Sequence, residues 1–482
     1  MKPKLSHIDL FAGCGGLSLG LEQAGFELAL AVEKSPMAAE TFYHNFIERI
    51  TDQAAFDKFA SEATSVEEQA ARGLVAKEVA SLLRSPKVLA ALKARDIDLV
   101  AGGPPCQGFS LAGRRNPDDL RNRLPWQFLQ FVEAVCPKAV IIENVSGMRQ
   151  DFKKHGKASP FDDLRVALAE TGPGYCVQPV QLNAVHFGAP QNRPRVFLVA
   201  LRKDIAAAAG FVASENVWRS DYDQIGSILF RSRPLVAPKA THFGDNVLTV
   251  KDALSDINAN GYRRKSNIPS FAQEMRSDIG WLPARSREGH VPGKLKNHTT
   301  RKHAEHVETR FKLYQYLRDA RIHSRILALP RQVGTPARLR KALVLQGLAG
   351  APVPAIAPDG TVLATSRNGL ADVIMSLGTK KHSQRSLDWD APSPTIVSMP
   401  DDFVHPEEPR TLTVREMARI QSFPDSFEFR SKETTGSLRR RFEVPQYTQV
   451  GNAVPPKLAR ALGEAVRSAL EAASGLRSRK AS

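Results

Sequence analysis

Short apolar runs, each followed by polar or turn-forming residues, recur through the first part of the chain. They lie at residues 7–11, 28–32, 96–101, 138–144 and 196–201 and have the length of buried strands. Between the first two runs, residues 17–24 have helical spacing and end at Gly25, a residue typical of helix C-termini. Strands that alternate with helices in this way predict a doubly wound α/β sheet.

The pattern changes twice along the chain. Residues 46–95 are alanine-rich and charged with helical spacing, which predicts an added helical insertion. From about Lys203 to Pro409 the strand and helix rhythm fades, and proline, glycine and basic residues become frequent. Regular patterning resumes where Thr413 and Glu416 have the spacing of a capping box. We therefore expect a first domain over residues 1–203, a second over 204–444, a return to the first over 445–475 and a basic tail over 476–482.

Composition narrows the class of protein. The formal net charge is +17 and the isoelectric point is about 9.8, which favours a polyanionic partner. Between Tyr262 and Lys341, basic residues outnumber acidic ones roughly three to one, as expected of a surface that faces phosphates. The four cysteines form no CxxC pair, so neither a zinc site nor a disulfide framework is predicted. With no apolar run of membrane-spanning length and no signal peptide, we expect a soluble cytoplasmic protein.

The first turn, residues 11–16, has the sequence Phe-Ala-Gly-Cys-Gly-Gly and joins a predicted strand to a predicted helix. Such a turn is either a tight bend that needs positive φ or part of a nucleotide site. Glu33, about 20 residues further on, stands where these folds place a carboxylate for ribose hydroxyls. The chain has no GxxxxGK[ST] motif, so a nucleoside cofactor without a pyrophosphate fits best, and S-adenosylmethionine is the candidate.

Cys106 follows Pro104 and Pro105 at the end of the third predicted strand. Most lone intracellular cysteines are small buried hydrophobes. The two prolines, however, disfavour a helical conformation and present this thiol on a stiff loop. A nucleophilic cysteine reacts as the thiolate and needs positive neighbours, which Arg193 and Arg195 could supply.

Glu143 ends the apolar run 139–142. It is either a solvent-facing strand end or a carboxyl with a raised pKa in a crevice, and the sequence leaves both open. Arg193 and Arg195 alternate, so on an extended segment they would share a face and grip a phosphate or a base oxygen, or simply be solvated. The histidines of NHTTRKHAEH, namely His298, His303 and His306, lack the carboxylates or cysteines of a metal site, and we interpret them as part of a basic surface.

Seven segments, in this order, resemble the motif series of the DNA (cytosine-5)-methyltransferase family. They are DLFAGCGGLSLG, Glu33, GGPPCQGFS, the ENV that begins at Glu143, QNRPR, RTLTVREMARIQSFP and QVGNAVPP. The resemblance spans nearly the whole chain. It implies a Rossmann-like S-adenosylmethionine-dependent methyltransferase domain, with a smaller target-recognition domain inserted at 204–444 and a return at 445–475.

The resemblance also implies roles for individual residues. Cys106 would be the nucleophile, Glu143 would bind ring nitrogen 3 of cytosine, and Arg193 and Arg195 would lie near the flipped base and the active-site loop. Residues expected to bind the cofactor are Phe11, Ala12, Gly13, Gly15, Gly16, Leu17, Glu33, Pro105, Leu124 and Asn452. The family usually has an Asp-Ile pair that contacts the adenine; Asp96-Ile97 is too close to Cys106, so this contact stays unassigned.

The implied reaction is methyl transfer from S-adenosylmethionine to carbon 5 of a flipped-out cytosine in a specific DNA sequence, through a covalent bond to Cys106. No metal is required. We expect a monomer on double-stranded DNA in the bacterial nucleoid, without a membrane partner, and a cognate restriction endonuclease that acts separately. The alternatives are an RNA (tRNA) cytosine-5 methyltransferase and a catalytically silent DNA-binding regulator on the same scaffold.

Overall fold

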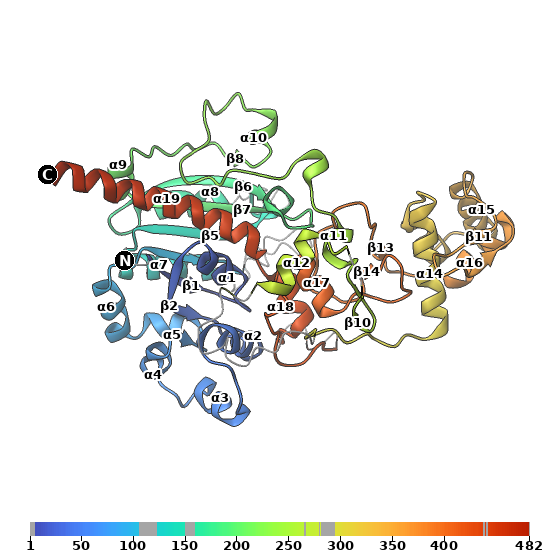
Figure 1. Ribbon diagram of the computed structural model, residues 1–482, viewed down its shortest axis with the longest axis horizontal. Helices are drawn as coiled ribbons and strands as arrows, with labels where there is room; N and C mark the ends of the chain where they lie inside the picture. Colours follow the sequence, from blue (N-terminus) through green and yellow to red (C-terminus); the bar gives the residue numbers. More distant parts are fainter. Residues whose placement is uncertain are drawn as a thin grey trace.

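The computed structural model describes residues 5–105, 123–149, 160–264, 267–278, 280, 295–436, 439 and 442–481. Figure 1 shows a broad α/β body joined to a smaller, mainly helical lobe at the opposite end of the molecule. None of the described helices is both long and apolar enough to cross a bilayer.

An eight-stranded sheet forms the centre of the body, in the order β3-β2-β1-β4-β5-β7-β6-β8. All neighbours pair in parallel except β7, which runs antiparallel to both β5 and β6. The strands are β1 (Leu5–Leu10), β2 (Phe26–Val32), β3 (Leu74–Val75), β4 (Leu99–Gly102), β5 (Ala139–Val145), β6 (Tyr175–Asn183), β7 (Pro194–Arg202) and β8 (Trp218–Arg219). The predicted α/β sheet is therefore confirmed.

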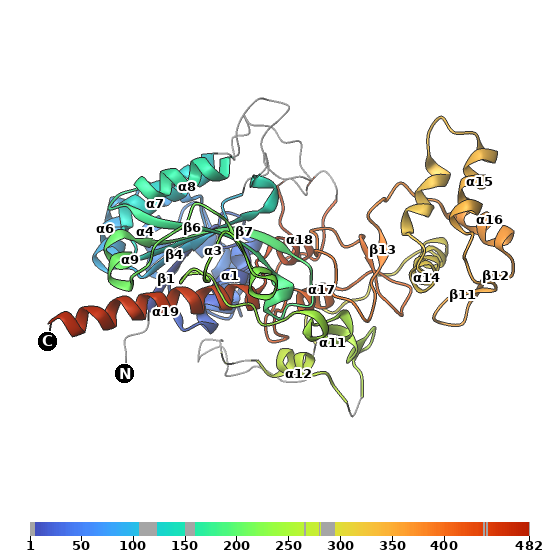
Figure 2. The same ribbon diagram turned by 90° about the horizontal axis from the view of Figure 1, so that it is seen from above.

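Helices cover both faces of the sheet, which explains why its strands are mainly apolar. One face packs against α1 (Gly16–Gln23), α9 (Lys203–Ala209) and α19 (Pro456–Ala481). The other packs against α6 (Pro86–Ala94), α7 (Leu124–Val135) and α8 (Pro160–Glu170). Figure 2 shows α19 on one side of the sheet and α7 with α8 on the other. Helix α19 continues to Ala481, through most of the expected basic tail 476–482.

Residues 46–95 are not simply an added helical insertion. They contain the predicted helices, α3 (Gln53–Ala60), α4 (Val66–Ala71), α5 (Val79–Leu83) and α6, but also β3, which pairs with β2 as an edge strand of the sheet. With only two residues, β3 is too short to produce a hydrophobic period. Before it, α2 (Pro36–Phe42) and a π-helical turn (Tyr43–Ile47) lead from β2 into this segment.

The sequence pattern also failed to indicate β6, because Gln178 and Pro179 interrupt its apolar positions. The long hairpin that it forms with β7 holds both strands in one register from Tyr175–Arg202 to Asn183–Pro194. Consequently β7 begins at the edge of the sheet where the parallel strands end.

Residues 204–444 are distributed over three places in the structure. Their first part supplies β8 and packs on the sheet. A second part, including α11 (Val250–Leu254), α12 (Ser270–Ser277) and α17 (Val414–Ile420), shares one hydrophobic core with the first turn and with α18 (Gln446–Asn452). The third part is the lobe, with a core of its own built from α14 (Glu305–Asp319), the 3₁₀ helix η7 (Ser324–Arg331), α15 (Ala337–Gly347) and α16 (Arg367–Leu377).

The remaining elements are short. They are α10 (Tyr222–Ile225), the strand pairs β9 (Ile257–Asn258) with β10 (Gly261–Tyr262), β11 (Ala355–Ile356) with β12 (Val362–Ala364) and β13 (Arg385–Ser386) with β14 (Phe403–Val404), and the 3₁₀ turns Ser146–Arg149, Ala184–Phe187 and Gly244–Asn246.

Candidate active site

Four of the residues selected from the sequence lie at the carboxyl edge of the sheet. Gly13 follows β1, Glu33 follows β2, Pro105 follows β4, and Glu143 lies near the end of β5. In open α/β sheets the ligand crevice lies outside this edge. Because β7 is antiparallel, its first residues, including Arg195, lie at the same edge, where Val145 pairs with Arg195.

Glu143 and Arg195 form the centre of this edge. Arg195 Nε lies 3.1 Å from Glu143 Oε1, and both side chains are largely buried. Burial raises the pKa of Glu143, while the positive charges of Arg195 and then Arg193 oppose that shift. The carboxyl is therefore largely buried with a raised pKa, which excludes the alternative of a solvent-facing strand end.

The loop that leads to Cys106 starts beside this carboxyl. A Cβ atom added to Gly103 would lie 2.9 Å from Glu143 Oε2, so only glycine fits there without displacing the carboxyl. Asn144 Nδ2 donates to the carbonyl of Pro104 at 3.3 Å and ties the loop to the end of β5. Cys106 itself lies outside the described residues.

Arg193 does not share a partner with Arg195, contrary to the expectation from their alternation. Its side chain is 1% exposed and donates to the carbonyls of Ile396, Gly451 and Ala453 at 2.8 to 3.0 Å. These three acceptors come from the C-terminal half of the chain, more than 200 residues away in sequence. Arg193 thus clamps the return segment onto the sheet and has Nη1 and Nη2 occupied by protein carbonyls.

The turn after β1 has open space on one side. Gly13 has φ +57° and a Cβ added there would meet nothing within 4 Å, so the space beside it is open. Its N–H donates to Glu33 Oε2 at 2.9 Å, and Ser35 N–H donates to the other carboxylate oxygen. Burial raises the pKa of Glu33, and these two hydrogen bonds oppose the shift. The two hydrogen bonds fix the carboxylate beside the turn, and its contact with a ribose stays a prediction.

Other residues of this turn have packing reasons for their identity. A Cβ on Gly15 would lie 2.3 Å from the ring of Phe46, and one on Gly16 would lie 2.4 Å from the carbonyl of Val454. Ala12 and Leu17 are buried in the core. Their direct contact with a cofactor stays a prediction.

The remaining predicted cofactor residues have partly open positions. Phe11 has φ 60° and is half-buried at the start of the turn. Leu124 is the half-buried first residue of α7, and Pro105 is exposed. Asn452 is exposed between Gly451 and Ala453, whose carbonyls Arg193 holds. The arginine clamp therefore also positions Asn452.

Comparison with known proteins identifies the family. The C-5 cytosine-specific DNA methylase family matches residues 5–468. The chain belongs to that family. It is similar to the type II methyltransferase M.AgeI of Thalassovita gelatinovora, with 31% identity over 97% of this chain and 100% of that protein. It is also similar to M.XorII of Xanthomonas oryzae pv. oryzae, with 30% identity over 96% of this chain and 84% of that protein.

Among solved structures, a crystal structure described as a DNA modification methyltransferase encoded within an E. coli prophage has a TM-score of 0.55 and 24% identity, and covers 97% of this chain and 99% of that chain. This likeness shows a shared fold. The predicted methyltransferase fold and the class DNA (cytosine-5)-methyltransferase are thus confirmed.

The methylase family's Asp-Ile pair has no counterpart at the strand end next to Glu33. There, Val75 accepts a hydrogen bond from the Glu33 N–H, and Ala76 and Lys77 follow. Lys77 turns away and donates to Glu62 at 2.8 Å. Asp96 precedes β4 at the opposite edge of the sheet, where it pairs with Lys138, so Asp96-Ile97 does not belong to the site.

A buried ion-pair network in the RTLTVREMARIQSFP motif was not selected from the sequence. Arg410 donates to both carboxylate oxygens of Glu416 at 2.8 and 2.7 Å, and Glu416 also closes the predicted capping box with Thr413. In the same helix Arg419 pairs with Asp256 and Asp425. The sequence signal that could have revealed this network is the presence of charged residues inside an otherwise apolar helix. Charged residues are buried only when they are paired, so their presence there indicates partners.

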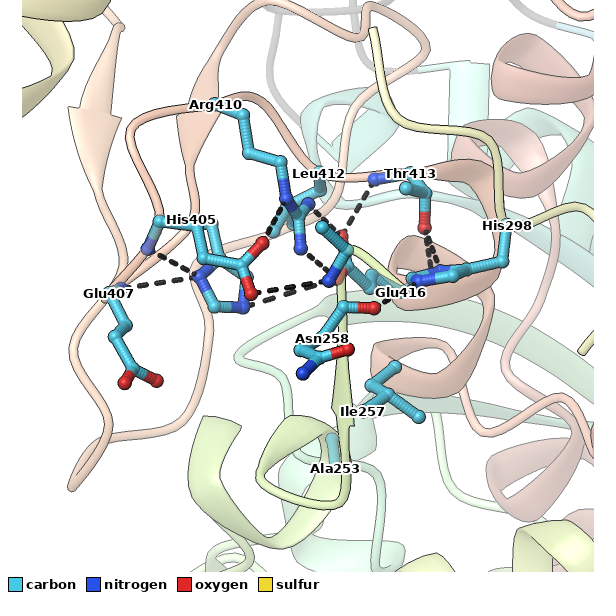
Figure 3. Close-up of polar contacts among 12 residues, drawn as sticks. Ala253, Ile257, Asn258, His298, His405, Glu407, Arg410, Leu412, Thr413 and Glu416 are labelled. Atoms are coloured by element: carbon cyan, nitrogen blue, oxygen red, sulfur yellow. Dashed lines mark hydrogen bonds and ion pairs between the residues drawn. The ribbon is translucent and has the colours of Figure 1, made fainter. Parts of the chain in front are cut away.

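Figure 3 shows this network joined to two histidines. His405 Nδ1 accepts the N–H groups of Glu407 and Glu408, and burial lowers its pKa to about 4. His298 lies between Thr413 Oγ1 and the carbonyl of Asn258. Its placement corrects the interpretation of this histidine as part of a basic surface. Among the described residues, no three His, Cys, Asp or Glu side chains gather as a metal site would require.

Proposed function

We propose that this methylase transfers the methyl group of S-adenosylmethionine to carbon 5 of a flipped-out cytosine in a specific sequence of double-stranded DNA, through a covalent bond to Cys106. The observation that carries the proposal is the Glu143–Arg195 pair, buried at the carboxyl edge beside the loop that leads to Cys106. A carboxyl with a raised pKa, held by an arginine, suits the recognition of a base whose ring nitrogen accepts a proton.

The residues at the first turn fit the cofactor. Glu33 accepts two backbone N–H groups and keeps acceptor capacity for ribose hydroxyls, and the open side of Gly13 leaves room for a ligand against the backbone. Phe11 and Asn452 would complete the walls of the pocket. When bound, S-adenosylmethionine supplies an electrophilic methyl group.

The chain's own residues activate the base. The Cys106 thiolate forms a bond to carbon 6, and the electron pair of the 5,6 double bond makes carbon 5 nucleophilic. Glu143 hydrogen-bonds or protonates nitrogen 3 and so stabilises the electron-rich ring, while Arg195 fixes the carboxyl. After methylation, carbon 5 loses its proton to a base, the bond between Cys106 and carbon 6 breaks, and the aromatic ring is restored.

Recognition of the target sequence is assigned to the lobe, within the predicted recognition domain 204–444. The rest of that segment packs into the body, whereas residues 305–377 have their own core. We propose that the enzyme acts as a monomer on DNA and serves beside a restriction endonuclease of the same specificity, since the similar proteins from Thalassovita gelatinovora and Xanthomonas oryzae are named type II methyltransferases.

The test uses a radioactive methyl donor with plasmid DNA and, separately, with bulk tRNA. Label in DNA, read as 5-methylcytosine by bisulfite sequencing, is the expected result; label in tRNA alone would replace the proposal with the RNA-modifying alternative. No label in either would favour the silent regulator.

Two further measurements test the covalent step. Cys106→Ala should abolish transfer and keep cofactor binding. Duplexes carrying 5-fluorocytosine should become covalently attached at Cys106, because fluorine does not leave as a proton does. Turnover by Cys106→Ala, or a peptide map without the adduct, would contradict the covalent mechanism.

A further inference from the structure

One stretch of the lobe carries only positive charge. No Asp or Glu occurs between Asp319 and Asp359, whereas six basic residues do: Arg321, Arg325, Arg331, Arg338, Arg340 and Lys341. The stretch covers η7, the connection at 332–336, and α15. Such a one-signed surface repels itself unless a polyanion covers it.

Several of the other described basic residues predicted to face phosphates form ion pairs within the protein. Arg263 pairs with Glu407, Arg301 with Asp401, and Lys312 with Asp359. Arg276 and Asp256 form a further pair. Of the six basic residues in the stretch without acidic residues, Lys341 alone has an ion pair among the described residues, with Asp372, so the stretch keeps most of its positive charge.

Within that stretch, the guanidinium groups of Arg321, Arg325 and Arg338 are exposed and have no side-chain partner among the described residues. Arg331, Arg340 and Lys341 are engaged by Gly378, Pro330 and Asp372. Positions three apart share a face of a 3₁₀ helix. Arg325 therefore lies on the same face of η7 as Arg331, the last residue before the connection at 332–336.

Helix α15 exposes one side to solvent, and its other side packs on the core of the lobe. Of its residues, only Val344 is fully buried. Arg338, Ala342 and Gln346 are exposed and follow one another at intervals of four, so they lie along one face. At a rise of about 1.5 Å per residue this row is about 12 Å long, which corresponds to three or four base pairs of about 3.4 Å.

The side chains in this row suit the reading of bases. Arginine and glutamine form paired hydrogen bonds with guanine and adenine edges in the major groove, and the small Ala342 lets the helix approach closely. Beside the row, Val333 is 91% and Leu339 51% exposed, and apolar side chains of this kind contact the methyl group of thymine. Figure 2 shows the connection between η7 and α15 at the outer tip of the lobe, on the same side of the molecule as α8.

We propose that α15 enters the major groove of the target DNA, where Arg338 and Gln346 hydrogen-bond to base edges and Arg325 contacts the phosphate backbone. This inference rests on the proposed function, because it names the surface with which the methylase selects its sequence. An acidic protein could also bind these positive charges, but its binding would not depend on DNA sequence. Base-specific effects of the variants therefore distinguish DNA from an acidic protein at this surface.

The experiment begins with bisulfite sequencing of DNA methylated by the wild-type enzyme, which defines the target. Arg338→Ala, Gln346→Ala and Ala342→Glu are then compared with Arg231→Ala, which removes an exposed arginine of the body that has no partner among the described residues. For each variant, kcat/KM is measured on the target duplex and on duplexes with one base pair changed, together with thermal unfolding and cofactor binding.

We expect Arg338→Ala and Gln346→Ala each to lower kcat/KM on the target by about 5- to 150-fold and to relax the preference at one base pair. Ala342→Glu should eliminate methylation of the target, because it places a carboxylate in the groove. Arg231→Ala should stay within about twofold of the wild type. Arg325→Ala should weaken all sequences equally and reduce the salt dependence of binding.

The failures of the two proposals are distinguishable. If the wild type methylates DNA but Ala342→Glu methylates the same sites at the same rate, the α15 inference is wrong and the methyltransferase function stands. Uniform losses over all sequences for Arg338→Ala and Gln346→Ala would also overturn base reading. A wild type that does not methylate DNA would refute the proposed function itself.

Discussion

The Nε atom of Arg195 lies 3.1 Å from Oε1 of Glu143 across the β5–β7 pair. The two residues are diagonal neighbours, since Arg195 pairs with Val145 and Glu143 with Phe197. On an antiparallel pair, long side chains at diagonal positions can meet. Because β7 runs antiparallel to β5, its first residues lie beside the last residues of β5. This reversal places the positive charge of Arg195 against the carboxyl of Glu143.

Arg195→Gln should lower kcat by about 100-fold or more, the usual effect of removing one positioned donor. The loss of its charge should also raise the pKa of Glu143 further, because the positive charge of Arg195 opposes the effect of burial more strongly than any other group does. If protonated Glu143 is required, the alkaline limb of the kcat profile should move to higher pH. Arg202→Gln, at the other end of β7, is the control. An unchanged alkaline limb would show that the protonation of Glu143 does not set the alkaline limb of kcat.

Arg193→Ala should mainly destabilise the fold. It removes a donor from three buried carbonyls, of which only that of Ala453 keeps another among the described residues, from Gln421, at a cost of about 1–3 kcal/mol for each unsatisfied group. Thermal unfolding should show a large loss for this variant and a smaller one for Arg195→Gln, where Glu143 can take up a proton when its partner is removed. If Arg193→Ala unfolds like the wild type and loses only kcat, the catalytic role expected from the sequence would be correct after all.

Gly13→Ala and Gly16→Ala should separate cofactor binding from packing. The added methyl at Gly13 enters open space, so strain of about 1 kcal/mol from its positive φ is the main structural cost, and affinity for S-adenosylhomocysteine should fall at least about tenfold. Gly16→Ala forces a methyl against the Val454 carbonyl and should cost about 1–3 kcal/mol of stability. Calorimetric titration and thermal unfolding measure both effects. Normal affinity in Gly13→Ala would mean that the open space is not the cofactor pocket.

Glu416→Gln should destabilise the protein by up to about 3–5 kcal/mol at neutral pH, because the buried Arg410 would lose its two-pronged carboxylate partner and keep only Glu408 as an ion-pair partner among the described residues. The ion pair with Arg410 lowers the pKa of Glu416 from 4.5 to about 2. Its contribution is therefore complete above pH 4.5 and is lost as pH falls toward 2, so the difference from the wild type should shrink below pH 4.5. Glu464→Gln, in an exposed pair with Arg460, should change stability by less than about 0.5 kcal/mol at any pH. A difference that is constant with pH would contradict this assignment.

Much of the sheet and of its functional edge was predictable from local patterns. The apolar runs of β1, β2, β4, β5 and β7 are visible in the sequence because a strand covered on both faces must be apolar at successive positions. Glu33 and Glu143 stand out for the same reason, since each interrupts or ends such a run. The capping box at Thr413 was equally local and is confirmed.

The errors have a common cause. The edge strand β3, with two residues, and β6, interrupted by Gln178 and Pro179, take their conformation from hydrogen bonds to neighbouring strands and lack a period of their own. The charged residues Glu416 and Arg419 suggest an exposed helix face, yet partners at Arg410 and Asp256 permit their burial.

The sequence by itself determined that the chain folds as an α/β methyltransferase with Glu33 and Glu143 at strand ends, because strand, turn and end are set by consecutive residues. Only the tertiary structure decided that Arg195 faces Glu143 while Arg193 clamps Ile396, Gly451 and Ala453. It alone also separated the lobe from the body and left one side of α15 exposed. These outcomes depend on contacts between segments far apart in the chain. No local pattern specifies which of two neighbouring arginines, Arg193 or Arg195, will contact a given distant segment.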